Sequence, residues 1–164
     1  MVATYVLYNA GTGIGIDLGD TRSADLIVQK KAFLKQTVLS TQDPVVQPPE
    51  IASNNLVLLG LWVANPFVRL YFPKLRLDSL YSPEKFPNQK DMWKLAGEFG
   101  ISADGKYIIS TKKRGKTTVT VVGGVQEPDT WKAANIFVSP TISPFIPVGI
   151  SGAVISGAIY ASVR

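Results

Sequence analysis

The chain has 164 residues, of which 46% are apolar and 18% are charged, and its formal net charge is +5. This length and apolar content are typical of one folded domain with its own core rather than of a disordered chain. The sequence contains no cysteine and no histidine, which excludes disulfides, thiolate or imidazole metal ligands, and catalysis by cysteine or by a serine–histidine–aspartate triad.

The N-terminal part is predicted to contain a strand, a glycine-rich turn and a helix. Residues 4–8 are strand-like, and glycines follow at positions 11, 13, 15 and 19. Their spacing departs from the dinucleotide fingerprint, and residues 14–21 resemble only the first phosphate loop of actin/Hsp70-type ATPases, so we favour a tight turn over a phosphate site. Apolar residues recurring every seven positions predict a helix over 22–38 that is capped by Asp20 and Thr21, although Leu26-Ile-Val28 alone could form a strand.

The middle of the chain alternates buried strands with short connections. Residues 41–54 are predicted to form a loop, and the apolar run 55–60 a buried strand closed by glycine. A helix beginning near Pro66 should stop at Pro73, and the connection 73–92 carries too many prolines for regular structure.

A hairpin on Asp104-Gly105 is expected to join residues 99–102 to residues 106–110. A second buried strand over 117–122 and a helix over 129–137 complete the globular part. The sequence therefore predicts an α/β fold in one domain, residues 1–139, with a central mixed, partly parallel sheet flanked by helices. The sheet should include residues 4–9, 55–60 and 117–122.

The C-terminal segment, residues 140–164, differs in character because residues 133–163 carry no charge. As a helix, residues 148–163 would place small residues on one face, as in close-packed membrane helices. An extended segment that pairs with a neighbouring subunit, or a final core strand with a tail, fits the composition as well. The residues expected to make assembly contacts are Gly152, Val154, Ile155, Gly157, Ile159 and Tyr160.

Two other groups of residues are candidates for binding. Loops that follow parallel strands are where α/β sheets place small ligands; the candidates there are Gly60, Asn65, Gly123, Gly124 and Asp129. A basic run could contact a polyanion, although no aromatic residues are interleaved with it and a solvated hairpin loop explains it more simply. This run comprises Lys112, Lys113, Arg114 and Lys116.

Two segments resemble an α/β domain of archaeal surface-layer (S-layer) proteins. In that family one strand reads like N-L-I-L-V-G-G-P-V-A-N-P, and a later strand reads like V-V-V-A-G before D-T and an alanine-rich helix. Residues 55–66 and 119–134 are similar to these, except that Leu61-Trp62 replaces Gly-Pro, and the resemblance covers roughly residues 54–137. It implies a non-catalytic building block and supplies no catalytic residues.

We therefore expect a non-enzymatic structural protein that self-assembles in a cell-surface layer, a surface filament or a virus-like particle of archaeal type, at the cell surface or outside the cell. No signal peptide is visible, and the absence of cysteine also fits a hot environment. A homo-oligomer is expected, with membrane contact through the C-terminal segment as an option; no cofactor, no metal and no nucleic acid are expected. The alternative is a small-molecule or nucleotide-binding module that uses loops 60–66 and 123–130.

Overall fold

The computed structural model describes residues 2–11, 19–62, 64–73, 107–124 and 126–139, and the backbone of residues 154–155 and 158–163. The strands are β1 (Thr4–Tyr8), β2 (Leu34–Thr37), β3 (Asn55–Leu59), β4 (Tyr107–Arg114), β5 (Thr117–Gly124), β6 (Val154–Ile155) and β7 (Ala158–Val163). The helices are α1 (Thr21–Lys31), α2 (Pro49–Ala52), α3 (Pro66–Tyr71) and α6 (Glu127–Phe137).

The strands form one mixed sheet in the order β2-β1-β3-β5-β4-β7-β6. Strands β2, β1, β3 and β5 are parallel to one another, β4 runs antiparallel to β5, and β7 runs parallel to β4. The predicted α/β fold with a mixed, partly parallel sheet is therefore confirmed. The predicted strands near the N-terminus and at 55–60 and 117–122 correspond to β1, β3 and β5.

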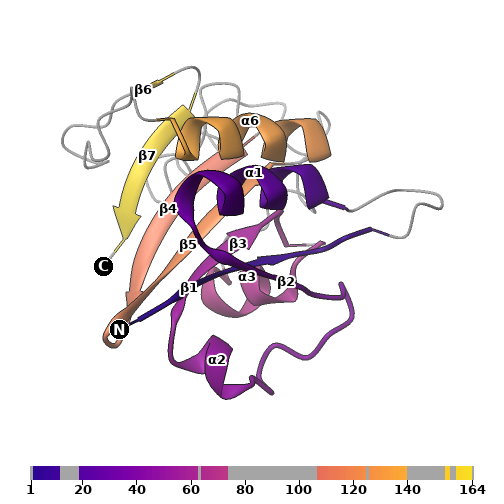
Figure 1. The fold of residues 1–164 in the computed structure, drawn as a ribbon, viewed down its shortest axis with the longest axis vertical. Helices are drawn as coiled ribbons and strands as arrows, with labels where there is room; N and C mark the ends of the chain where they lie inside the picture. The colour runs from indigo at the N-terminus through magenta and orange to yellow at the C-terminus, as the bar shows by residue number, and fades with distance from the viewer. Residues whose placement is uncertain are drawn as a thin grey trace.

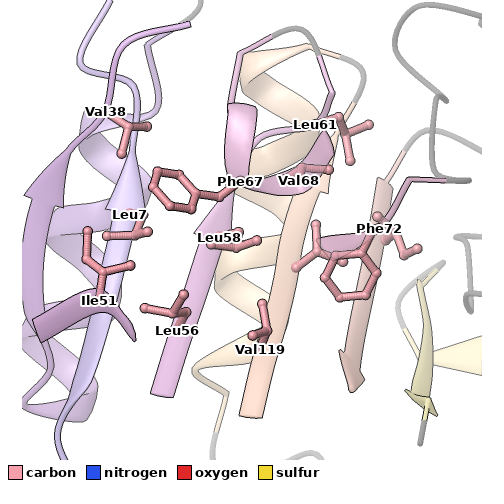
Figure 2. Close-up of a cluster of buried hydrophobic side chains, with 12 residues drawn as sticks. Leu7, Val38, Ile51, Leu56, Leu58, Leu61, Phe67, Val68, Phe72 and Val119 are labelled. Atoms are coloured by element: carbon pink, nitrogen blue, oxygen red, sulfur yellow. The ribbon is translucent and has the colours of Figure 1, made fainter. Parts of the chain in front are cut away.

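Helices cover both faces of the sheet, as Figure 1 shows: α1 and α6 lie side by side on one face, and α2 and α3 lie on the other. Under α2 and α3, side chains of β1, β3 and β5 pack with Phe67, Val68 and Ile51 (Figure 2). On the opposite face Ala24, Ile27 and residues of α6 pack against the same strands. Because both faces are buried, the parallel strands read as continuous apolar runs.

The prediction of one helix over 22–38 is wrong in its second half. Helix α1 ends at Lys31 because Ala32 adopts the left-handed conformation with φ +56°, which breaks the helical path. Residues 34–37 then form β2, which pairs in parallel with β1. The seven-residue recurrence of apolar residues is thus split between a helix and a strand and does not describe one helix.

The predicted hairpin on Asp104-Gly105 lies outside the described residues, as do residues 99–106 generally. The hairpin that the structure does show joins β4 to β5 through a turn at Gly115 and Lys116. The residues before that turn, 112–114, belong to β4, so the basic run is mostly strand and only its end is loop. The loop predicted over 41–54 also contains the short helix α2.

Candidate functional site

The carboxyl ends of β1, β3 and β5 meet at one edge of the sheet, where α1, α3 and α6 begin. The strand order reverses between β1 and β3, because the chain leaves β1 for β2 on one side and returns to β3 on the other. Open α/β sheets bind ligands at such a switch point. A ligand site in this fold is therefore expected at this end of the sheet.

Asn65 joins the ends of β1 and β3. Its side chain is fully buried, and its Nδ2 donates hydrogen bonds to the carbonyl oxygens of Leu7 at 3.1 Å and Leu59 at 3.0 Å. Its Oδ1 accepts a hydrogen bond of 3.0 Å from the backbone N–H of Phe67, which caps α3. All three contacts are to the main chain, so the residue holds two strands and a helix start together.

Asn9 plays a similar part directly after β1. Its Nδ2 donates to the carbonyl oxygen of Ala64 at 3.0 Å, and its Oδ1 accepts from the backbone N–H of Gly11 at 2.7 Å. The backbone N–H of Asp20 donates to the Asn9 carbonyl at 2.7 Å, which returns the chain to the sheet edge where α1 begins. Sequence reasoning missed Asn9; the signal was an amide side chain at the end of a buried strand.

Two glycines bring the ends of β3 and β5 into direct contact. Gly60 has φ +83°, and a Cβ there would lie 2.7 Å from Oδ2 of Asp20. A Cβ on Gly123 would lie 2.2 Å from the carbonyl oxygen of Gly60, far inside the van der Waals limit. These positions need glycine because backbone and carboxylate already occupy the space a side chain would take.

Asp20 is the N-cap residue of α1, as predicted, but its side chain makes no capping hydrogen bond. The carboxylate is buried and lies toward Gly60 instead. At the start of α6 a capping contact is present: the Asp129 carboxylate accepts a hydrogen bond from the backbone N–H of Gln126. Thr130 accepts a 2.9 Å hydrogen bond from the backbone N–H of Gly124.

The five predicted ligand-loop residues are thus brought to one end of the sheet, and the contacts that the structure describes for their polar groups are contacts within the chain itself. Arg22 connects α1 to α6. Its guanidinium makes a bidentate hydrogen-bonded ion pair with Glu127 and lies 4.5 Å from the ring centre of Trp131. The hydrogen bonds to Glu127 raise the pKa of Arg22.

In the basic run, Lys112 and Arg114 lie on one face of β4, Lys113 alternates with them, and Lys116 lies in the turn after the strand. Arg114 donates from Nη2 to the carbonyl oxygens of Ile51 and Asn54, at 2.8 and 2.6 Å, and from Nη1 to the Tyr71 hydroxyl at 2.6 Å. Lys112 lies over the ring of Phe72, with Nζ 5.2 Å from its centre, and partial burial lowers its pKa. Lys113 and Lys116 are exposed, so two of the four predicted residues face solvent freely enough to meet a polyanion.

The C-terminal segment contributes strands to the sheet. Residues 158–163 form β7 and residues 154–155 form β6, in agreement with the extended alternatives and not with a helix over 148–163. Val154, Ile155, Ile159 and Tyr160 lie on these strands, whereas Gly152 and Gly157 lie outside the described residues. Among the described residues no helix is long and apolar enough to cross a bilayer.

In the part of the chain that the structure describes, no three acidic side chains gather as a metal site. Comparisons with protein-family models, with characterised proteins and with solved structures find no match to this chain.

Proposed function

We propose that the protein is a non-catalytic structural subunit that self-assembles in a surface layer, a surface filament or a particle shell. The observation that carries this proposal is how the polar groups at the strand ends are used. Asn9 and Asn65 are buried, and their side chains bond to backbone groups of their own chain. Open α/β sheets bind ligands at these strand ends, whereas these two side chains hold the chain's own segments together.

The C-terminal strands support the same proposal. Strand β7 extends the sheet beyond β4, with Ile109 opposite Tyr160 and Lys112 opposite Val163, and β6 lies at the sheet's end. The uncharged segment therefore ends in strands at a sheet edge, where main-chain groups can pair with a neighbouring subunit. The resemblance to surface-layer domains points in the same direction.

The test is the mass in solution of the full chain and of a version that ends at Pro147, measured by light scattering. We expect a large oligomer for the full chain and a folded, smaller species for the truncated one, with circular dichroism checking the fold. As a second variant, Val154→Ser with Ile155→Ser alters only β6, which pairs only with β7 among the described strands, and should lower the mass without unfolding the domain. A full chain that stays monomeric at every concentration overturns the proposal.

The alternative function, a small-molecule or nucleotide-binding module, is favoured by the switch point between β1 and β3, although the buried Asp20 carboxylate beside it would repel a phosphate. It predicts that a nucleotide or inorganic phosphate raises the melting temperature of the full chain. The substitution Asp20→Asn would then change the size of that shift. No shift with either compound at millimolar concentration counts against this alternative.

A further inference from the structure

Strand β2 forms one edge of the sheet, and nothing else in the described part of the chain pairs with its outer side. The backbone N–H of Val38 donates to the Tyr8 carbonyl at 2.8 Å, in register with the parallel β1–β2 pairing. Because alternate residues of a strand turn their backbone groups to opposite sides, Gln36 also faces β1, whereas Lys35 and Thr37 present their N–H and C=O groups outward. Such an edge is a template for another strand.

The sequence of this edge is symmetric in character about Gln36. Residues 33–39 read Phe-Leu-Lys-Gln-Thr-Val-Leu, so a polar residue flanks Gln36 on each side and two apolar residues follow in each direction. When two copies of one strand pair antiparallel about a two-fold axis, each residue faces the one equally far from the axis on the other side. A symmetric pattern is therefore what a self-pairing strand needs.

We propose that β2 is an interface between two copies of this chain, in which the two β2 strands pair antiparallel about a two-fold axis at Gln36 and join the sheets into one. In this register Lys35 faces Thr37 of the second copy and Leu34 faces Val38. The two Lys35–Thr37 pairs place their four outward N–H groups and four outward carbonyls opposite one another. The proposal rests on the proposed self-assembly and names one of its contacts.

Side-chain burial fits this partner. Leu34 is 52% exposed and Leu39 is 68% exposed; the symmetric pairing brings Leu39 near Phe33 of the second copy, and it places Leu34 beside Val38, whose side chain packs in the core of its own chain. Side chains directly opposite each other lie on the same face of the sheet. The two-fold axis must therefore pass at a residue and not between two residues. Of the two central choices, an axis at Lys35 would oppose two lysines, whereas an axis at Gln36 opposes two neutral amides.

The charge around the edge also favours a second copy over an anionic surface. Lys30 and Lys31 lie in the last turn of α1, but Lys35 is the only lysine or arginine in residues 32–68, so β2 and the loop after it offer a membrane or a nucleic acid little to bind. Lys35 itself donates a hydrogen bond to the Asp25 carboxylate of α1, which raises its pKa and offsets its charge. A lysine often protects an edge strand from pairing, but this one is already held by its own chain.

The absence of cysteine makes a direct test available. In an antiparallel pair that lacks mutual hydrogen bonds, opposite Cα atoms are about 4.5 Å apart, which is within the range that a disulfide spans. The variant Gln36→Cys should therefore form a disulfide-linked dimer under mild oxidation of the full chain, read on a non-reducing gel. Lys35→Cys and Thr37→Cys are matched controls. In the proposed register residue 35 lies opposite residue 37 of the second copy, so a cysteine at either position does not lie opposite another cysteine. They should cross-link at least several-fold less.

A second pair of variants tests the same register without a cysteine. Thr37 is exposed, so both substitutions leave the monomer's core untouched. The two-fold axis creates two pairs of residue 37 with Lys35 in each dimer. Thr37→Glu should therefore tighten association several-fold and Thr37→Lys should weaken it several-fold. Both effects should become smaller at high salt. The readout is the dissociation constant from sedimentation at several concentrations.

The outcomes separate this proposal from the proposed function. A large assembly in which the Gln36→Cys variant cross-links no better than the two control variants, or whose affinity ignores the charge at position 37, overturns the β2 interface and leaves self-assembly standing. A full chain that is monomeric and does not cross-link overturns both. Selective cross-linking at position 36, together with opposite responses to Thr37→Glu and Thr37→Lys, supports the interface.

Discussion

Two regions of this protein differ in which side chains they bury: one buries polar side chains, and the other exposes apolar ones. At the carboxyl ends of β1 and β3, polar side chains such as Asn65 are fully buried and bonded to the main chain. Along β2 and the loop after it, apolar side chains such as Leu39 and Val46 are more than two-thirds exposed. Burying a polar group is tolerated only where its hydrogen bonds to water are replaced. The polar side chains at these strand ends therefore hold parts of the fold together.

The second region is held in place by contacts of its own. Arg69 donates to the carbonyl oxygens of Ser40 and Trp62, each at 2.6 Å, and Gln47 exchanges hydrogen bonds with the Tyr71 hydroxyl. The loop is thus anchored while its apolar side chains point away from the core. Ordered apolar surface of this kind is typical of a contact with another protein.

The largest loss of stability is expected from Gly123→Ala, at the contact between the ends of β3 and β5. The added Cβ would meet the carbonyl oxygen of Gly60 at 2.2 Å, and since both are backbone positions neither can move aside cheaply. We expect a loss of more than about 3 kcal/mol in the free energy of unfolding. Denaturant titration followed by circular dichroism measures it.

The control for this variant is Gly115→Ala in the β4–β5 turn, where a Cβ meets nothing within 4 Å and only the positive φ of 60° opposes it. It should cost about 1 kcal/mol. Equal losses at the two positions would contradict the close contact between the ends of β3 and β5.

An intermediate effect is expected from Arg114→Met, compared with Lys113→Met beside it. Loss of Arg114 leaves the carbonyl oxygens of Ile51 and Asn54 without their charged donor, which should cost about 1.5–3 kcal/mol. Lys113 is exposed, so its removal should change stability by less than about 0.5 kcal/mol. Thermal unfolding of both variants decides whether Arg114 is a structural residue; similar melting temperatures would show that it is not.

The smallest effect on stability is expected at the exposed edge, from Leu39→Ser. Because this side chain is 68% exposed, the free energy of unfolding should change by less than about 0.5 kcal/mol, while self-association through β2 weakens. Val46→Ser, at 74% exposure, lies outside the symmetric strand and is the matched control. Sedimentation at several concentrations that finds equal association in both variants would remove Leu39 from the interface.

Part of the candidate site could be predicted from the sequence. Glycine after a buried apolar run, followed by Asn-Pro or by acidic residues at a helix start, located Gly60, Asn65, Gly123 and Asp129 at one edge of the sheet. Their partners could not be predicted, because the Gly60–Gly123 contact joins residues that are distant in the chain. The contacts of Arg114 are with residues that are also distant in the chain. The sequence therefore suggested one basic patch, although Arg114 is bound to its own chain.

The sequence by itself determined the elements whose local signal is strong. Strands β3 and β5 are apolar runs that must be buried wherever they lie, and α6 carries its own start signals at Glu127 and Asp129. Only the tertiary structure decided that residues 34–37 form a strand. Leu-Lys-Gln-Thr has no strong preference of its own, and the hydrogen bonds offered by β1, reached after the helix ends at Ala32, make it the edge of the sheet.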